Sequence, residues 1–252
     1  MSATLSYVFC LVRGARRPTL RGIGDGMPGG GKLRAIEVGD RFWAIVQSVP
    51  EGEYGESSLA RGLQDLEWVG PRAIAHERVI ESFLSSTALL PMQLFTLFNS
   101  DDRVVEHVRS DRARITRILK RIEKKVEWGV RLTWNEQAAR DKAAKKQART
   151  GAEFLARKRD VLDVSRKQLA EARTAADRVY KAIDRQAAAS QRRTSLERAA
   201  PGSRLLLDAA FLVPAARSGA FKTAVREQTR ALRGTGIETS VTGPWPAYNF
   251  IQ

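Results

Sequence analysis

The sequence predicts a protein of mixed α and β structure, and three observations support this prediction. Short apolar segments rich in β-forming residues, such as 41–49 and 204–213, occur between longer segments whose apolar residues recur at helical spacing. The chain has 252 residues, which at about 100–200 residues per domain favours two domains over one. Hydrophobic residues make up 43% of the chain, so it contains enough apolar material for a packed core.

In the first half of the chain, strands and helices are both expected. Strands are expected over 6–13, 32–38, 41–49 and 89–98. A helix is expected from about Leu66 to Ser86, because six residues recur at helical spacing of four and three and so form one stripe: Val69, Ala73, His76, Ile80, Phe83 and Thr87. One further helix is expected from Asn99 or Ser100 to Lys125. Its first turn is acidic and its last turns are basic, which complements the helix dipole.

The second half is expected to contain a long helix. No Gly or Pro occurs from Ala152 to Ala200, and one apolar position recurs every seven residues, at Leu155, Leu162, Leu169, Ala176 and Ile183. The seam is thin and includes Lys158 and Gln186, so packing on a sheet is favoured and a two-stranded coiled coil is the alternative. Shorter elements are expected as strands over 126–134, 204–213 and 237–241 and as a helix over 218–233.

The net charge of the chain is +15, and this charge is concentrated in one segment. Residues 135–200 carry an excess of +8, whereas residues 51–100 carry −4, with the acidic side chains in the block 51–81. Such asymmetry indicates either an anionic partner surface or self-association. A solvated helix face is an equally compatible explanation.

The sequence favours a soluble cytoplasmic protein. Cys10 is the single cysteine, which excludes a disulfide framework and a cysteine-based zinc site. The apolar run from Tyr7 to Val12 is too short for a signal peptide, and its basic residues follow it instead of preceding it. No window reaches the 18 apolar residues that indicate a transmembrane helix, so no membrane association is expected.

Two phosphate-loop patterns occur in the first long loop. Gly24-Asp-Gly26-Met-Pro-Gly29 fits G-x-G-x-x-G, and Gly26 to Lys32 fits the Walker pattern up to its lysine. Leu33 stands where a magnesium-binding Ser or Thr is required, and a strand follows instead of a helix. An ordinary loop between strands is therefore expected, and a nucleotide-dependent enzyme is a third-ranked alternative.

No catalytic, cofactor-binding or metal-binding residues are expected. The two histidines, His76 and His107, lie on separate predicted elements, and no cysteine cluster accompanies them. His76 is on the apolar stripe, so we expect a hydrogen-bonded core histidine, and His107 is expected near the surface. No nucleophile has an identifiable base. The sequence thus predicts a protein that is not an enzyme and takes no small-molecule substrate.

A series of motifs resembles the gas vesicle protein F/L family over most of the chain. The motifs, in order, are Tyr7-Val-Phe, Leu63-Gln-Asp-Leu-Glu-Trp68, Ala75-His76-Glu77, Leu89-Leu-Pro-Met-Gln-Leu-Phe95, Val126-Glu-Trp-Gly-Val-Arg131, Gly151-Ala-Glu-Phe-Leu-Ala-Arg-Lys-Arg159, Asp208-Ala-Ala-Phe-Leu-Val213 and Thr242-Gly-Pro-Trp-Pro-Ala-Tyr-Asn-Phe250. Each motif alone is weak, whereas their order is specific. Leu94-Phe95, the basic insert 135–150 and the stretch 187–203 depart from the family pattern.

The resemblance implies an α+β protein of two domains. These are an N-terminal mixed α+β domain, 1–125, and a C-terminal modified ferredoxin-like domain with a long helix, 126–252, which ends in an extended aromatic and proline tail, 243–252. The implied order βαββαβ requires one more strand near 187–195, although the pattern of that stretch is helical.

The resemblance further implies a non-catalytic gas vesicle assembly factor or minor gas vesicle component, located in the cytoplasm and at the gas vesicle. Its implied partners are the small hydrophobic shell protein and other gas vesicle accessory proteins. Candidate interaction residues lie on the basic helix and in the tail: Arg157, Lys158, Arg159, Arg166, Lys167, Trp245, Tyr248 and Phe250. For the tail, packing against the protein's own domains is an equally compatible explanation.

A basic nucleic-acid-binding module is the alternative function. The charge of +15 and the basic helix are compatible with phosphate binding. However, the sequence contains no zinc finger, no clear helix-turn-helix, no RNP-type strand and no KH loop, and acidic residues interrupt the basic runs. Nucleic acid is therefore not the expected partner.

Overall fold

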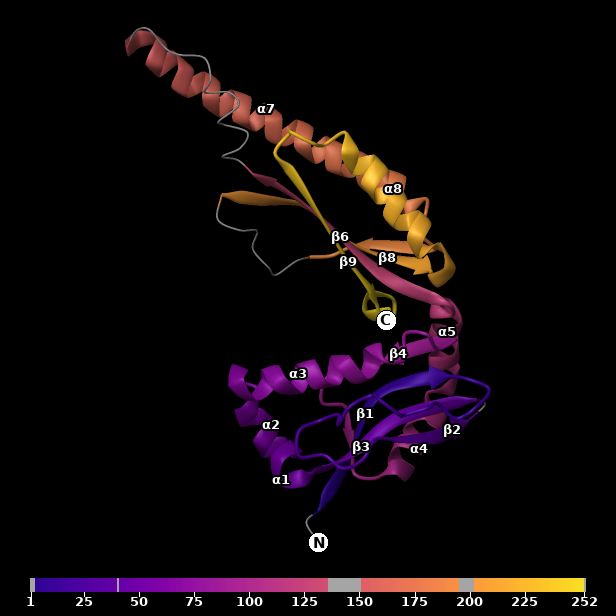
Figure 1. The fold of residues 1–252 in the computed structure, drawn as a ribbon. Helices are drawn as coiled ribbons and strands as arrows, with labels where there is room; N and C mark the ends of the chain where they lie inside the picture. The colour runs from indigo at the N-terminus through magenta and orange to yellow at the C-terminus, as the bar shows by residue number, and fades with distance from the viewer. Residues whose placement is uncertain (1–2, 40, 136–150, 195–201, 252) are drawn as a thin grey trace. The chain divides into compact units, whose positions relative to one another are not determined.

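The computed structural model describes residues 3–39, 41–135, 151–194 and 202–251, with the side chains of 151–165 not described (Figure 1). The chain forms two compact units. The first unit comprises Met1–Val126 together with Trp245–Gln252, and the second comprises Glu127–Pro244. Each unit has its own sheet and its own helices, and the two are described separately below.

The sheet of the first unit is built around its first strand. Its strands are β1 Thr4–Arg13, β2 Arg34–Gly39, β3 Phe42–Pro50, β4 Ala88–Pro91 and β5 Leu97–Phe98. The order is β2-β3-β1-β4, and β5 also pairs with β1. All of these pairings are antiparallel, and the hairpin expected between 32–38 and 41–49 is present as β2 and β3.

Strand β1 is buried along most of its length, which places it at the centre of the unit. Its register against β3 shifts between Val8 and Cys10, which is the signature of a β-bulge. After this shift, both Phe9 and Cys10 join the hydrophobic cluster that includes Val79 and Ile80 of the helix α3. The pattern of β1 is a continuous apolar run because both faces of the sheet are covered.

Five helices of the first unit surround this sheet in the described residues. They are α1 Glu51–Tyr54, α2 Glu56–Gly62, α3 Leu66–Glu81, α4 Asp101–Ser110 and α5 Arg112–Ile122. Helix α3 packs on β1, α4 on β2, and α5 on β4. The short helices α1 and α2 occupy a stretch in which the sequence pattern predicted no helix.

Two helix predictions were wrong in their extent. The expected single helix to Lys125 is broken at Asp111, where the Ser110 hydroxyl donates to the His107 carbonyl at 2.8 Å. The helix expected to reach Ser86 ends at Glu81, and Ser82 makes the same kind of bond to the Arg78 carbonyl. In both cases a serine hydroxyl binds a backbone carbonyl near the helix end, where such bonds compete with helix continuation.

The predicted strand 89–98 was also wrong in its extent. It is divided into β4 and β5, and the connecting residues include Phe95 at a positive φ of 63°. A non-glycine residue in this conformation reverses the chain direction and cannot continue an extended strand. Two short strands therefore replace one long strand.

The second unit follows the order β-α-β-β-α-β. Its elements are β6 Lys125–Asn135, α7 Gly151–Asp184, β7 Ala189–Arg192, β8 Ser203–Pro214, the short 3-10 helix η1 Ala215–Arg217, α8 Ser218–Arg230 and β9 Ile237–Trp245. The strand order is β7-β8-β6-β9. The additional strand near 187–195 is confirmed as β7, antiparallel to β8, although it is shorter than predicted.

Helix α7 packs on the sheet and on α8, as Figure 1 shows for the second unit. Its buried residues Ala172, Ala176, Val179 and Ile183 follow helical spacing. Ala172 contacts Trp134 of β6, with Leu206 and Ile237 packed alongside. The preference for packing on a sheet over a coiled coil is therefore confirmed for the described part of this helix.

The tail divides between the two units. Strand β9 extends to Trp245, four residues beyond its predicted end, and a 3-10 turn η2 follows at Tyr248–Phe250. Residues from Trp245 onward group with the first unit, whereas the sequence placed 243–252 with the C-terminal domain. The burial of Ala247 and Phe250 accounts for this difference, since both side chains lose their solvent contact there.

Candidate interaction surfaces

The tail is anchored in the first unit by polar and apolar contacts. The Tyr248 hydroxyl donates to the Glu77 carboxylate at 2.6 Å, and Arg121 donates to the backbone carbonyl of Phe250. Burial, followed by the bond to Glu77, raises the pKa of Tyr248. Phe250 is only 6% exposed, whereas Trp245 is 37% exposed. Of the three tail candidates, only Trp245 presents a large exposed aromatic surface.

Next to Glu77, the buried His76 connects three segments of the first unit. Its Nδ1 lies 2.8 Å from the Tyr7 hydroxyl, and its Nε2 lies 3.2 Å from the Met92 carbonyl. Because a carbonyl can only accept, Nε2 carries the proton and Nδ1 accepts from Tyr7. The Tyr7 hydroxyl in turn accepts from the backbone N–H of Phe95 at 3.2 Å. His76 is thus the hydrogen-bonded core histidine that the sequence predicted.

The electrostatic state of this chain of bonds follows from its burial. Burial lowers the pKa of His76 to about 4, against the opposing effect of the bond to Met92. Burial likewise raises the pKa of Tyr7. Both groups are therefore neutral near pH 7, and their arrangement holds β1, α3 and the β4–β5 connection together.

The glycine-rich loop is occupied by a side chain of the protein itself. Gln47 of β3 accepts from the Met27 amide at 2.7 Å and donates to the Asp25 and Gly31 carbonyls at 2.7 and 2.6 Å. A Cβ on Gly26 would lie 2.5 Å from the Gln47 side chain. The glycine pattern is thus explained by the close approach of Gln47, and the expectation of an ordinary loop between strands agrees with this geometry.

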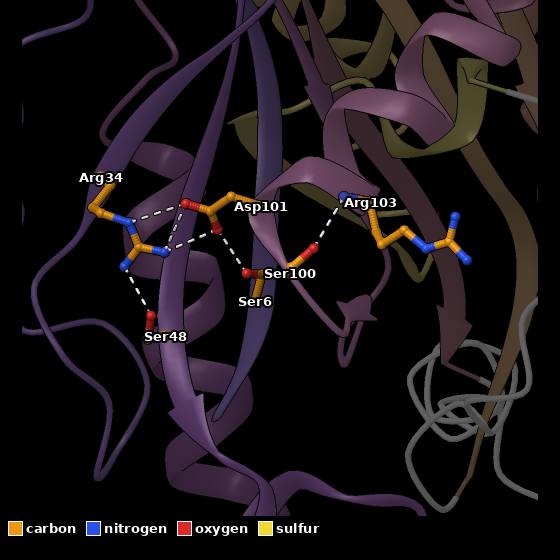
Figure 2. A network of polar contacts seen from close by, with 6 residues as sticks. All are labelled: Ser6, Arg34, Ser48, Ser100, Asp101 and Arg103. Atoms are coloured by element: carbon orange, nitrogen blue, oxygen red, sulfur yellow. Dashed lines mark hydrogen bonds and ion pairs between the residues drawn. The ribbon is translucent and has the colours of Figure 1, made fainter. Parts of the chain in front are cut away.

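A second polar network fixes helix α4 on the sheet (Figure 2). Arg34 of β2 binds both carboxylate oxygens of Asp101, at 2.9 and 3.0 Å from Nη2, and also donates to the Ser48 hydroxyl at 3.0 Å. Ser6 of β1 donates to the same carboxylate at 2.6 Å. The Ser100 hydroxyl accepts from the Arg103 amide at 3.3 Å and caps the helix. Asp101 therefore has a structural role, as its position in the first turn of the helix predicted.

In the second unit, the buried carboxylate of Asp208 on β8 binds one arginine on β6 and another directly after β7. Asp208 of β8 accepts from Arg131 of β6 at 3.0 Å and from Arg193 at 2.9 Å. Burial raises the pKa of Asp208, but the bonds to Arg193 and Arg131 outweigh it, so the net shift is downward. Arg131 and Asp208 belong to two of the sequence motifs that carry the family resemblance, and this contact joins the two motifs in the second unit.

The basic candidates are only partly within the described side chains. Arg166 and Lys167 are exposed on α7, whereas the side chains of Arg157, Lys158 and Arg159 lie outside the described residues. Helix α8 adds a basic stripe that the sequence analysis missed. The exposed cations of this stripe are Lys222, Arg226, Arg230 and Arg233. Their spacing of three and four residues was the available signal.

An exposed apolar stripe on α2 and α3 was also missed. Leu63, Leu66 and Ile74 are 54%, 86% and 61% exposed. Leu66, Gly70 and Ile74 are spaced four residues apart, so they lie along one side of α3. The predicted stripe described only the opposite, buried face, which contains His76 and Ile80. Helix α3 is therefore apolar on two faces.

The described residues form neither a metal-binding cluster nor a membrane-spanning helix. Among them, no group of three or more His, Cys, Asp or Glu side chains is arranged to hold a metal ion. None of the helices in the described ranges combines the length and apolarity needed to cross a membrane.

The described residues thus define a two-unit protein of mixed α and β structure, and the comparisons with known proteins identify its family. A family model described as gas vesicle synthesis protein GvpL/GvpF matches residues 5–252. The chain therefore belongs to the GvpL/GvpF family of gas vesicle synthesis proteins.

Individual relatives agree with this assignment. The chain is 29% identical to gas vesicle protein L of Streptomyces sp. (strain CB03234), over 98% of this chain and 92% of the relative. The fold is similar to the crystal structure of gas vesicle protein GvpF from Anabaena sp. PCC7120, with a TM-score of 0.70 and 14% identity over 99% and 96% of the two chains. GvpF from Microcystis aeruginosa gives a TM-score of 0.65 and 15% identity over 100% of both chains.

Proposed function

We propose that this protein is a non-catalytic gas vesicle assembly factor, or a minor gas vesicle component, that binds the small hydrophobic shell protein and other gas vesicle accessory proteins. The family match over residues 5–252 is the observation that carries this proposal. A small hydrophobic subunit that polymerises through apolar and sheet surfaces aggregates if those surfaces are exposed too early. A folded partner that covers them prevents this and delivers subunits to the growing vesicle at its site in the cytoplasm.

The second unit is proposed to be a modified ferredoxin-like domain. The order β-α-β-β-α-β and the strand order β7-β8-β6-β9 support this description. In this arrangement β9 is an edge strand, paired with β6 on one side. Its side chains are largely exposed, including Val241 at 38% and Trp245 at 37%.

The edge of β9 is the surface best suited to the shell protein. An edge strand presents unpaired backbone N–H and C=O groups to which an extended segment of another chain can add. Val241 and Trp245 supply apolar contacts beside that edge. The exposed Arg166 and Lys167 of α7 offer cations for a charged part of a partner. This proposal keeps Trp245 as the tail residue that contacts a partner, while Tyr248 and Phe250 anchor the tail.

Co-expression with a gas vesicle shell protein tests this proposal. The protein is captured by an affinity tag at about 150 mM salt, where exposed charges are screened beyond roughly 8 Å. Recovery of the shell protein is expected from the wild-type chain. Replacing Val241 and Trp245 with Lys is expected to reduce it strongly, because charged side chains on an edge oppose strand addition.

A matched control separates this effect from a general change of charge. Ser57→Lys with Thr223→Lys adds the same two charges at exposed positions outside β9. This control is expected to recover the shell protein as well as the wild type does. If neither the wild type nor the control captures the shell protein, the proposed function is wrong. If the β9 variant captures it fully, the surface is wrong.

A further inference from the structure

The outer face of α3 combines exposed apolar side chains with acidic neighbours. Leu66 and Ile74 are separated by eight residues, which corresponds to roughly 12 Å along the helix axis. Asp65 and Glu67 are exposed beside this stripe, as are the cations Arg61 and Arg78, and Asp65 caps the helix by accepting from the Glu67 amide at 2.9 Å. This surface lies within the region 51–100, whose net charge is −4.

The orientation of α3 that exposes this stripe is fixed by Arg72 on the opposite side. The Arg72 guanidinium lies 3.9 Å from the Trp68 ring centroid and 5.2 Å from the Tyr54 ring centroid. It also pairs with Glu53 at 3.2 Å, with the Arg72 side chain only 10% exposed. Rotation of α3 to bury Leu66 or Ile74 would break the contacts of Arg72 with Tyr54 and Glu53, which lie outside α3, so the stripe is a constant feature of the unit's surface.

The second unit carries a surface of the opposite kind. A groove of about 550 Å³ runs between α7, the end of α8 and the start of β9. Its apolar lining includes Ala172, Ala175, Val179, Ala231, Leu232 and Ile237. The lining runs from Gln168 to Val179 on α7, which corresponds to roughly 16 Å along that helix. An apolar stripe of roughly 12 Å is short enough to fit within it.

The charges around this groove complement those around the stripe. The groove wall contains Glu171 and Arg178, and the adjoining helix α8 carries three exposed cations, Lys222, Arg226 and Arg230, against one acidic residue, Glu227. The small side chains of Ala172 and Ala175 permit close approach of another helix. Opposite charges that flank matched apolar surfaces favour specific association and accelerate it.

We propose that the Leu66–Ile74 face of α3 in one molecule docks into the α7–α8 groove of a second copy of this chain. The two surfaces are different, so the contact is heterologous, and a pair retains one free groove on one molecule and one free stripe on the other. Association therefore continues head to tail beyond the dimer as the protein concentration rises. Opposite charge and matched dimensions within one sequence select a second copy as the occupant.

Sedimentation velocity of the purified full chain tests this proposal without any shell protein, so its outcome is independent of the proposed function. The weight-average mass is expected to rise above the 28.0 kDa of the monomer as concentration increases to about 100 μM at 50 mM salt. At 500 mM salt, where the Debye length falls to about 4 Å, the rise is expected to shift to higher concentration. A chain that stays monomeric at 100 μM and 50 mM salt overturns the proposal.

Two variants remove one surface each. The stripe variant is Leu66→Lys with Ile74→Lys, and the groove variant is Arg178→Glu with Arg230→Glu. Each is expected to weaken self-association by about tenfold or more, since residues at the centre of an interface dominate its energy. The control Arg16→Glu with Arg17→Glu makes the same charge change as the groove variant at exposed loop positions and is expected to associate like the wild type.

Mixing the two variants provides the decisive measurement. In a 1:1 mixture, the intact groove of the stripe variant binds the intact stripe of the groove variant, so a dimer is expected that does not grow further. An interface formed by the same surface on both molecules gives no recovery in the mixture. A mixture that remains monomeric, or a stripe variant that associates like the wild type, contradicts the proposed contact.

Discussion

At the scale of single residues, the first unit depends on side chains that meet from distant parts of the sequence. Tyr7, His76 and Met92 share one chain of hydrogen bonds, and the neighbouring Glu77 accepts from Tyr248. Tyr7-Val-Phe, Ala75-His76-Glu77 and the C-terminal motif thus converge in one place. A buried donor or acceptor left without a partner costs about 1–3 kcal/mol, so these residue types are needed together.

Substitution of His76 tests the neutral state of this network. Because the folded pKa of about 4 lies below the unfolded value of about 6.5, the unfolded chain binds the proton first as pH falls. The wild type therefore has the full stabilisation above pH 6.5 and loses about 2 kcal/mol of it between pH 7 and pH 5. His76→Gln retains an acceptor and a donor but does not titrate.

Urea unfolding at pH 7 and pH 5 provides the measurement for both proteins. The wild type is expected to lose about 2 kcal/mol more than His76→Gln over this interval. Equal losses in the two proteins would show that His76 is protonated in the folded state as readily as in the unfolded chain, and the neutral assignment would then be wrong.

At the scale of elements, the glycine-rich loop illustrates how a backbone segment is fixed by one side chain. Gln47 makes three hydrogen bonds to the loop, and Tyr54 adds a fourth by donating to the Pro28 carbonyl at 2.7 Å. The loop amide of Met27 is already bonded to Gln47. A loop held in this way is part of the folded core and is not free to bind a phosphate through that amide.

Two alanine substitutions separate the Gln47 contact from backbone strain. Gly24 and Gly26 both have positive φ, but only at Gly26 would a Cβ meet Gln47, since nothing lies within 4 Å at Gly24. Both variants bear the cost of a left-handed alanine, about 1–2 kcal/mol. Gly26→Ala is expected to cost about 1–3 kcal/mol more in urea unfolding, because it displaces a buried side chain from its partners.

The comparison of these two variants has a clear alternative outcome. If Gly24→Ala and Gly26→Ala destabilise the protein equally, Gln47 does not hold the loop.

Thermal-shift measurements with ATP and magnesium test the alternative of a nucleotide-dependent enzyme. Lys32→Ala and the wild type are expected to show the same melting temperature with and without the nucleotide.

The elements were more predictable from the sequence than the contacts between them. Alternating or continuous apolar residues located the main strands, and the heptad positions on α7 located a helix that packs on a sheet. The break at Asp111 was not predicted, because it is associated with a local hydrogen bond of Ser110 and leaves no trace in the hydrophobic periodicity. Periodicity carries no information about which distant residues pair. It therefore could not predict the hydrogen bond between Tyr248 and Glu77 or the one between Arg131 and Asp208.

The candidate surfaces were only partly predictable for a similar reason. The regular spacing of apolar residues on α3 predicts its buried face. It does not reveal the second, exposed apolar face that contains Leu66 and Ile74. The composition of the aromatic tail predicts a contact segment, but composition does not distinguish a partner from the protein's own first unit. Burial decides this for Phe250, and exposure keeps Trp245 as a candidate.

At the scale of the whole molecule, the net charge of +15 requires a choice between protein and nucleic-acid partners. We expect no retained binding to random-sequence DNA or RNA above about 150 mM salt. Binding through phosphate contacts alone weakens steeply with salt, and no base-reading motif was found to offset this. Fluorescence anisotropy from 50 to 200 mM salt measures it. Tight binding that persists at 150 mM would favour the nucleic-acid module instead.

The assignment of Trp245–Gln252 to the first unit has a consequence for how the protein is made. The chain leaves that unit after Val126 and returns only after Pro244, so residues 127–244 are synthesised before the first unit has its last segment. At about 5–20 residues per second, the ribosome needs roughly 6–24 s for this interval. During that time Glu77 lacks Tyr248, and the site of Phe250 is unfilled. The first part of the protein to emerge is therefore the last to be completed.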